Sequence, residues 1–305
     1  MRKQVAAKVA DCLEATYPTA KALYMWRMKR GFNAAKDGPI LVLQMGKVGS
    51  MSVQAGLEEQ ELSRRIYHVH FLSPERTRKT EFERRSYFRT DRHHDLVRPW
   101  LNQFLLNQYE KTKDGPRWKI VTLTREPIGR NLSAFFENLV VRETGRPGEY
   151  EIQSDYYGID PVVVSTQDPG KVIDLFFEFG KHDSPIRFFE TEIRDIFGID
   201  VYREGFPQET GYKVYTGDRA DLLVLKIEKL KECAEEAFDC FLDIKGFRLV
   251  NKNVGAQKIY APLYEAAKKA MRVSTEYADM LYDSDYMKTF YSDSEIQAAR
   301  SRWQL

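Results

Sequence analysis

The chain has 305 residues, 43% of them hydrophobic and 30% charged, which is enough to bury a substantial core and favours a soluble globular protein. Its 47 basic and 45 acidic residues give a net charge of +2, so the chain as a whole has no general attraction for nucleic acid. Cys12, Cys233 and Cys240 form no CxxC pair, which excludes a zinc or disulfide framework and fits a reducing compartment. We therefore predict a cytoplasmic protein with no nucleic-acid partner.

Residues 1–36 are predicted to form an N-terminal helical extension of a single domain that spans residues 1–305. Apolar residues in this segment fall near helical spacing, and the charged residues between them give it a basic outer face. These charges interrupt any continuous apolar stretch, so the segment is not predicted to be a membrane span or a secretory signal. The basic face allows either peripheral contact with a membrane surface or ordinary packing of a helix.

Short apolar segments alternate with long helical patterns over the middle of the chain. Strands are predicted at residues 40–44, 66–71, 118–124 and 222–227. Helices are predicted at residues 50–62, 75–107 and 128–141. This alternation is typical of an α/β fold, in which helices cover both faces of a central, mainly parallel sheet.

The remaining segments have less regular patterns. Residues 145–170 are rich in Gly, Pro and Tyr and have no sustained period, which predicts a long loop over the sheet edge, of a kind that often covers substrates. Residues 201–215 predict two short strands around a turn-rich loop. Residues 260–305 predict a helical end of the chain.

The first strand runs into a glycine-rich turn and then directly into a helix, in the sequence ILVLQMGKVGSMS. Such a turn places unpaired main-chain N–H groups and the positive end of a helix around a small anion, usually phosphate. The glycines let the main chain approach the anion, and Lys47 adds a mobile positive charge. The anion-binding candidates are Gly46, Lys47, Val48, Gly49, Ser50, Met51 and Ser52. The alternative is a turn that uses glycine only to bend, with Lys47 in solvent.

The segment REPIGRNLS follows the third strand and departs from the pattern of nucleoside triphosphatases. The chain has no GK[ST] sequence, and Arg125 stands where those proteins place a magnesium-binding aspartate. Arg125 at the strand tip and Ser133 in the following helix lie toward the same sheet edge, where a charged fork and a hydroxyl can hold a second phosphate. The alternative is a surface arginine and a serine that bonds its own helix.

Together, QMGKVGSMS and REPIGRNLS resemble the two donor-binding elements of the sulfotransferases that use 3′-phosphoadenosine-5′-phosphosulfate (PAPS). In that family the first element binds the 5′-phosphosulfate, and the second, an R-x7-S element, binds the 3′-phosphate. The resemblance covers residues 40–138 well and the rest of the chain loosely. It implies a P-loop-like, three-layer fold, PAPS as the donor with no metal required, and a role for Lys47 at the leaving phosphate.

The second strand, RIYHVHFLSP, carries His68 and His70, whose side chains share one face near the edge of the sheet where ligands bind. A neutral imidazole suits proton abstraction near neutral pH, although histidines can also simply pack in a sheet. The H-x-H pair is similar to that of the glycan 2-O-sulfotransferases, which favours His70 as general base with His68 assisting. Glu58 or Glu59 is the reserve candidate, because other carbohydrate sulfotransferases use a carboxylate.

Three later segments also resemble parts of these enzymes. NKNVGAQKIYAPLYE is similar to the loop that closes over the donor nucleotide, which implies contacts from Asn253, Gly255 and Lys258; an ordinary loop is the alternative. DLLVLKIEKL resembles the late strand of the fold, with Glu228 at its end. RFFETEI, around Glu192, resembles a segment of bacterial polysaccharide-linked sulfotransferases.

The acceptor is predicted from the basic residues that follow the second strand. These residues are Arg76, Arg78, Lys79, Arg84, Arg85, Arg89 and Arg92. Such a cluster suits an acidic glycan, although the acidic residues between them also allow a solvated, ion-paired surface. The sequence thus predicts sulfuryl transfer to a hydroxyl group, most readily that of a carbohydrate. A P-loop nucleotide or sugar kinase and a noncatalytic glycan-binding protein are the rival functions.

Overall fold

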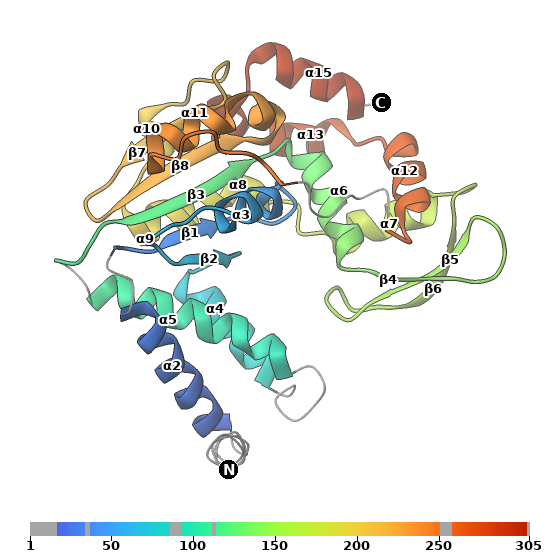
Figure 1. Cartoon of the computed structure of the whole chain (residues 1–305). Helices are drawn as coiled ribbons and strands as arrows, with labels where there is room; N and C mark the ends of the chain where they lie inside the picture. The colour runs from blue at the N-terminus through green and yellow to red at the C-terminus, as the bar shows by residue number, and fades with distance from the viewer. Residues whose placement is uncertain (1–16, 34–36, 86–92, 112–113, 251–257, 304–305) are drawn as a thin grey trace.

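The computed structural model describes residues 17–33, 37–85, 93–111, 114–250 and 258–303, which form two β-sheets and the helices around them (Figure 1). The larger sheet has five strands in the order β2-β1-β3-β8-β7. Its strands are β1 (Ile40–Leu43), β2 (Ile66–Val69), β3 (Trp118–Thr124), β7 (Tyr212–Thr216) and β8 (Ala220–Lys226). Four of them are parallel, and β7 joins the edge antiparallel to β8. The predicted α/β fold with a mainly parallel sheet is therefore confirmed.

Three of the four parallel strands, β1, β3 and β8, are almost entirely buried, whereas only Val69 is buried in the edge strand β2. Every residue of β1 and of β8 is buried, and β3 is buried except at Lys119. Such continuous apolar runs are expected of parallel strands that are covered on both faces. The predictions for these four strands are confirmed, with bounds that differ from the structure by no more than two residues. Their carboxyl ends meet at one edge, which carries the glycine-rich turn and Arg125.

Helices lie on both sides of the larger sheet (Figure 1): α3 and α11 cover one side, and α8 and α9 lie on the other. The helices that precede β3 and the one that follows it are α2 (Tyr17–Asn33), α3 (Ser50–Glu58), α4 (Pro74–Arg84), η2 (His93–Leu96), α5 (Val97–Lys111) and α6 (Pro127–Glu137). The middle of the chain adds α7 (Gly170–Phe179), α8 (Ser184–Phe188), the π-helix η3 (Phe189–Arg194), α9 (Asp195–Phe197), α10 (Val201–Glu204), η4 (Ile227–Lys229) and α11 (Leu230–Leu242). The chain closes with α12 (Ala261–Ala270), α13 (Thr275–Tyr282), α14 (Asp285–Phe290) and α15 (Asp293–Trp303).

The helix predicted over residues 75–107 is wrong as a single element, because the structure has α4 and α5 there. Pro99 accounts for the start of a new helix at Val97. It lies in the first turn of α5, where the missing N–H of proline costs no hydrogen bond, whereas in the interior of one long helix it would break the ladder. The described part of the predicted N-terminal extension, residues 17–33, is helical as expected and packs against α5.

Two other helices end earlier than predicted. Helix α3 stops at Glu58 rather than at residue 62, and α6 stops at Glu137 rather than at residue 141. In the second case the chain continues as strand β4, since Val140 and Val141 are β-branched and pair with the next strand. The residues assigned to a helix by their apolar spacing were therefore partly those of a strand.

The long loop predicted over residues 145–170 is also wrong. The structure has a three-stranded antiparallel sheet there, made of β4 (Val140–Glu143), β5 (Glu149–Ser154) and β6 (Ile159–Ser165). Alternate residues of β5 are buried, which is the pattern of a sheet with one covered face. Gly145, Gly148 and Gly158 have positive φ angles, so they serve the hairpin turns rather than an open loop.

The last part of the chain is helical, as predicted for residues 260–305, and α12 to α15 make up this end. The prediction for residues 201–215 is half wrong. The second of the two expected strands is β7, but the first is the short helix α10. Asp200 explains that helix, because its carboxylate accepts hydrogen bonds from the N–H groups of Tyr202 and Arg203 and caps the first turn.

Candidate functional site

The turn between β1 and α3 has the main-chain shape of an anion cradle. Gly46, Lys47 and Gly49 have φ angles of 82°, 61° and 84°, a left-handed run that is unusual for the lysine. A Cβ atom at Gly49 would stand 3.0 Å from the side chain of Ile227, so glycine is also needed there for space. Within the described part of the chain, the N–H groups of Lys47, Val48 and Gly49 make no hydrogen bond. They are therefore free to bind an anion at the start of α3.

The other residues predicted for this cradle have different surroundings. The Val48 side chain is buried in the core, so only its main chain can meet a ligand. Ser50 is buried as well, and its hydroxyl lies 3.1 Å from Nε2 of His68. Met51 is exposed and Ser52 is partly exposed on α3. The cradle thus depends on main-chain groups, with Lys47 as its cation.

The Arg130 side chain donates hydrogen bonds to the main chain of this turn, and the sequence analysis did not identify this residue. Its guanidinium donates to the carbonyl oxygens of Met45 and Gly46, the latter at 3.1 Å, and to the side chain of Asn131 at 3.0 Å. Burial lowers the pKa of Arg130 to about 10, so the group still carries its charge at neutral pH. The signal was present in the sequence, since Arg130 stands in the middle of REPIGRNLS. A buried arginine fork under a turn fixes the turn's shape.

Arg125 reaches the same turn from the end of β3. Its Nη1 donates to the carbonyl oxygen of Lys47 at 2.7 Å, and its main chain is held at 2.9 Å by the hydroxyl of Tyr286. Ser133 is partly exposed one and a half turns into α6, and its hydroxyl makes no hydrogen bond with the residues that the structure describes. Both predicted residues therefore belong to the strand and helix beside the cradle. Their binding of a phosphate stays a prediction.

Lys47 is paired with a carboxylate that the sequence analysis did not identify. Its Nζ lies 3.1 Å from Glu137 at the end of α6. Lys258 Nζ lies 3.3 Å from the same carboxylate, and the Tyr260 hydroxyl donates to it at 2.6 Å. Burial alone would raise the pKa of Glu137, but Tyr260 and the two lysines outweigh it, so the carboxyl stays ionised. Lys258 therefore shares a carboxylate with Lys47, and its contact with a donor nucleotide stays a prediction, while Asn253 and Gly255 lie outside the described residues.

His68 and His70 lie together beside the turn, joined by the side chain of Gln44. Gln44 Nε2 is 3.1 Å from His68 Nε2 and 2.7 Å from His70 Nδ1. The carboxamide oxygen of Gln44 accepts the N–H of Gly46, so the histidine pair and the cradle share one hydrogen-bonded network. The structure therefore brings together the predicted cradle and the predicted histidines, and adds Gln44 to them.

The electrostatic surroundings keep both rings neutral. Burial, helped by the neighbouring His68, Arg98 and Arg76, lowers the pKa of His70 to about 4. Burial and Arg98 also lower the pKa of His68, while Glu58 opposes them. A neutral ring can accept a proton, but a base of such low pKa is weak unless a nearby negative charge raises it. Glu58 and Glu59, the alternative bases, are exposed at the end of α3.

Glu192 supports the segment that follows the histidines. It is 1% exposed in η3, and its carboxylate accepts the N–H groups of Leu72 and Ser73 at 2.6 and 2.9 Å. Burial raises the pKa of Glu192, against the effect of those two N–H groups and of Arg76. π-helical turns are frequent at functional sites. Here the turn directs a carboxylate at Leu72 and Ser73, which lie between His70 and the start of α4.

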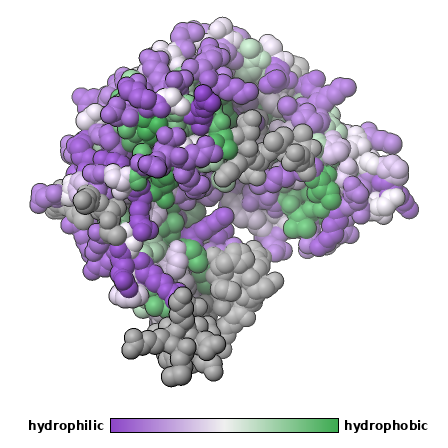
Figure 2. All heavy atoms as spheres, viewed as in Figure 1, coloured by the Kyte–Doolittle hydropathy of each residue, from purple (hydrophilic) through white to green (hydrophobic). Residues whose placement is uncertain are grey.

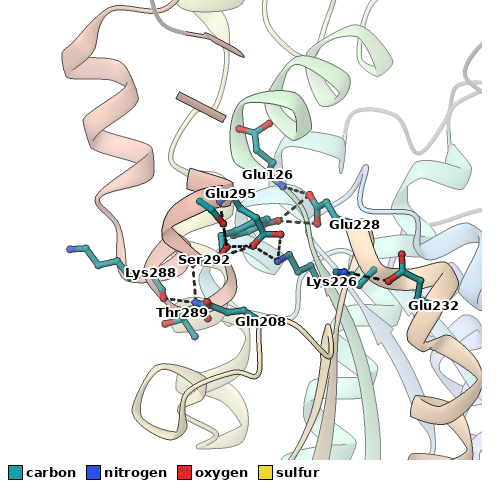
Figure 3. Close-up of polar contacts among 12 residues, drawn as sticks. Glu126, Gln208, Lys226, Glu228, Glu232, Lys288, Thr289, Ser292 and Glu295 are labelled. Atoms are coloured by element: carbon teal, nitrogen blue, oxygen red, sulfur yellow. Dashed lines mark hydrogen bonds and ion pairs between the residues drawn. The ribbon is translucent and has the colours of Figure 1, made fainter. Parts of the chain in front are cut away.

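A second polar network closes the sheet edge next to Arg125 (Figure 3). The Glu228 carboxylate accepts the N–H of Glu126 at 3.0 Å and the hydroxyl of Tyr291 at 3.2 Å. Lys226 is fully buried at the end of β8 and binds both carboxylate oxygens of Glu295 at 2.6 Å. These pairs tie α14 and α15 to the tips of β3 and β8. Each buried charge has its partner, so the network is a support for the edge.

A cavity of about 410 Å³ lies far from this edge. Its walls come from the residues before β2, the start of β3 and the end of α11, and they include Arg64, Lys119 and Cys240. These are the amino-terminal ends of the strands, whereas ligands of open α/β sheets bind at the carboxyl ends.

Figure 2 shows the surface hollowed between the small sheet and the main body, with hydrophobic residues gathered over the small sheet. Val140, Tyr156 and Val163 are among the exposed residues there.

One family model matches the chain. It is named NKWYS and described as "Putative capsular polysaccharide synthesis protein", and the match covers residues 168–292. No curated protein and no solved structure matches the chain. The matched segment contains Glu192, Lys226, Glu228 and Lys258, whereas Lys47, His68 and His70 precede it. Residues 168–292 are thus similar to a family that is described by polysaccharide synthesis.

No group of three or more His, Cys, Asp or Glu side chains in the described ranges is arranged to hold a metal ion. None of the helices within those ranges has the length and apolar character needed to cross a membrane.

Proposed function

We propose that the protein transfers a sulfuryl group from PAPS to a hydroxyl group of a polysaccharide or its precursor. One observation carries the proposal. Three unpaired main-chain N–H groups and Lys47 surround the start of α3, and Arg125 holds the Lys47 carbonyl from the neighbouring strand. This arrangement suits two phosphate groups on adjacent elements. The family match supports a polysaccharide as the acceptor.

The cradle would bind the 5′-phosphosulfate of PAPS. The N–H groups from Lys47 to Ser50 would donate to its oxygens, and Arg125 and Ser133 would hold the 3′-phosphate. Lys258 would add charge from the other side, together with Asn253 and Gly255 of the loop that precedes it. No step in this scheme needs a metal ion, because lysine, arginine and main-chain donors neutralise the phosphates.

The transfer itself would be an in-line displacement. The acceptor oxygen forms a bond to sulfur while the bond between sulfur and the bridging phosphate oxygen breaks, and 3′-phosphoadenosine-5′-phosphate (PAP) leaves. Lys47 would stabilise the negative charge that develops on that bridging oxygen. The acceptor proton would pass to His70, with His68 assisting. Glu58 or Glu59 is the alternative base.

The acceptor is proposed to approach from the side of α4 and α5. Arg76 and Arg98 lie close enough to His70 to lower its pKa, so they place positive charge around the proposed base. An acidic sugar would be attracted to that charge. Nothing in this scheme involves nucleic acid, and a cytoplasmic site of action stays a prediction from the sequence.

Isothermal titration calorimetry with PAP tests the donor. We expect PAP to bind without added metal, and we expect ATP with Mg²⁺ to bind much more weakly. The variants Arg125→Ala and Ser133→Ala should weaken PAP. A matched control is Ser165→Ala on β6, away from the cradle. Tight binding of Mg²⁺–ATP with no binding of PAP would replace this proposal by the kinase function.

A sulfate-transfer assay tests the reaction. Radiolabelled PAPS is incubated with capsular polysaccharides that do or do not contain uronic acid, and label in the polymer is counted. We expect label in the acidic polymers only, and none with Lys47→Ala. A protein that binds PAP but labels no acceptor would be a nucleotide-binding component rather than the transferase.

A further inference from the structure

Gln44 connects the glycine-rich turn with the histidine pair. It follows β1 directly and is 1% exposed, and its side chain has no part in the transfer described above. The carboxamide oxygen accepts the N–H of Gly46, while the amide nitrogen lies 2.7 Å from His70 Nδ1 and 3.1 Å from His68 Nε2. Three groups from two segments of the chain therefore meet at one side chain.

The N–H of Gly46 fixes the direction of this amide. A main-chain N–H can only donate, so the Gln44 atom that faces it must be the oxygen. The amide nitrogen then faces the rings, and its two hydrogens match the two ring nitrogens. A ring nitrogen that faces a donor must offer a lone pair, so the proton of each neutral ring must be on the other nitrogen.

We propose that Gln44 is a positioning residue that sets the tautomers of both histidines while the turn is empty. His68 then carries its proton on Nδ1, and His70 carries its proton on Nε2. The Ser50 hydroxyl, 3.1 Å from His68 Nε2, can donate to the lone pair of that nitrogen in this tautomer. In this state His70 presents a hydrogen-bond donor on Nε2, so that nitrogen cannot accept the proton of an acceptor hydroxyl.

An anion in the cradle would reverse this arrangement, an inference that rests on the proposed function. The 5′-phosphate would take the N–H of Gly46, because that group lies in the cradle. Gln44 would then lose the donor that orients it, and its amide could turn so that the oxygen faces the rings. The His70 proton would leave Nε2 for solvent and another would bind Nδ1, so the ring stays neutral and Nε2 gains a lone pair. Donor binding would thereby prepare the base.

Nitrogen-15 NMR of the imidazole rings tests both statements in the full chain. Protonated and unprotonated ring nitrogens resonate in separate regions, and single His→Gln variants assign the signals. His182 is an internal reference: its Nε2 faces the carbonyl oxygen of Phe177 at 3.2 Å, which only accepts, and its Nδ1 lies 2.7 Å from the Tyr277 hydroxyl. His182 must therefore be protonated on Nε2 throughout.

Without ligand at neutral pH, we expect His68 protonated on Nδ1 and His70 on Nε2. PAP at saturation should exchange the two His70 resonances and leave His182 unchanged. Gln44→Glu, which offers oxygen atoms only, should give the exchanged His70 spectrum without PAP. Gln44→Met, which offers no hydrogen bond, should give a mixture of tautomers. The fold of each variant is checked by its His182 signals.

The outcomes separate the two proposals. The Gln44 main-chain carbonyl also favours an N–H on His70, as the direction of its effect on the pKa of that ring indicates. A free protein with His70 protonated on Nδ1 would therefore overturn the role of the Gln44 side chain, whatever PAP does. Calorimetric binding of PAP with unchanged tautomers would overturn the coupling alone. Absence of PAP binding would overturn the coupling and the proposed donor, while the ligand-free spectrum still decides the role of Gln44.

Discussion

The ammonium group of Lys47 lies 3.1 Å from the carboxylate of Glu137, so the cation of the cradle already has an anionic partner in the free protein. Glu137 is in turn bound by Lys258 and Tyr260, from the segment just before α12. The carboxylate therefore occupies a position among cations that a phosphate group of the donor would also favour. Donor binding must compete with Glu137 for Lys47.

The first prediction concerns this competition. Glu137→Gln removes the negative charge and keeps the shape of the side chain, so we expect PAP to bind roughly two- to fivefold more tightly, which is the upper part of the range for a partly exposed ion pair. Calorimetry at low and at high salt measures the effect, and the gain should shrink at high salt. Glu143→Gln, an exposed carboxylate on β4, is the control and should leave PAP affinity unchanged. Weaker binding by the Glu137 variant would mean that Glu137 supports the cradle rather than competing for it.

The second prediction concerns the chemistry at Lys47. Lys47→Ala should lower turnover on the order of a hundredfold or more, since it removes a preorganised charge at the developing anion. PAP should still bind, because the main-chain donors of the turn remain. Turnover is measured with saturating PAPS, and affinity is measured separately by calorimetry. Near-normal turnover in the variant would show that Lys47 is not at the leaving group.

The third prediction separates the two phosphate sites. Arg125 also bonds the Lys47 carbonyl, so Arg125→Ala disturbs the cradle itself, whereas the Ser133 hydroxyl makes no hydrogen bond within the described residues. Ser133→Ala is therefore the cleaner variant. It should weaken PAP several-fold and leave adenosine 5′-phosphosulfate, which lacks the 3′-phosphate, unaffected. Equal losses for both ligands would remove the assignment of the 3′-phosphate to this helix.

The parts of the fold that the sequence predicted are those with a strong local pattern. The central strands of the parallel sheet, β1, β3 and β8, are runs of mostly buried residues with turn residues at their ends, and their prediction was confirmed. The small sheet was missed because Gly145, Gly148 and Gly158 read as loop residues, while the alternation in β5 is only six residues long. Val140 fits a helical spacing as well as a strand, and its pairing with Gln153 decides between them.

The sequence predicted only those site residues that belong to a recognisable motif and also lie at the end of a predicted strand. Lys47, His68 and His70 come from the ends of neighbouring strands, and sheet order alone brings such residues together. Gln44, Arg130 and Glu137 were missed because their roles depend on distances that spacing does not contain. Glu137, for example, is 90 residues from Lys47 along the chain. A glutamate at the end of a helix has no sequence feature that identifies its partner.

The fourth prediction concerns acid stability. The pKa of His70 is about 4 in the folded protein and near 6.5 when unfolded, so the unfolded chain binds the extra proton between these values. The contribution of His70 is complete above pH 6.5 and is lost as the pH falls toward 4. His68, Arg98 and Arg76 face the ring and all disfavour its charged form. When the pH is lowered from 7.5 to 5, the unfolding free energy of the wild type should fall by about 2 kcal/mol more than that of His70→Asn.

Urea unfolding at the two pH values measures this difference, and only the change with pH is compared, because the substitution also alters packing. His182→Asn is a useful second variant, since burial lowers the pKa of that ring too, by a mechanism unrelated to the cradle. Parallel losses in the wild type and in His70→Asn would show that His70 titrates normally in the folded protein.

The last prediction concerns the pH dependence of the reaction. If His70 accepts the acceptor proton, only its neutral form is active, so the rate must fall as the pH drops through the pKa of that ring. In the free enzyme this pKa is about 4, and kcat/KM for PAPS should therefore fall only as the pH approaches 4. Bound donor brings several negative charges to Lys47 and raises the pKa of His70, so the acid limb of kcat should lie at higher pH than that of kcat/KM.

His70→Ala should lower kcat roughly a hundredfold to ten-thousandfold and abolish the limb, with His68→Ala less affected. The profile is measured for these variants and for Glu58→Gln and Glu59→Gln, over the range in which each remains folded. A limb that survives in His70→Ala and vanishes in a glutamate variant would assign the base to α3 and leave the histidine pair as a support for the cradle.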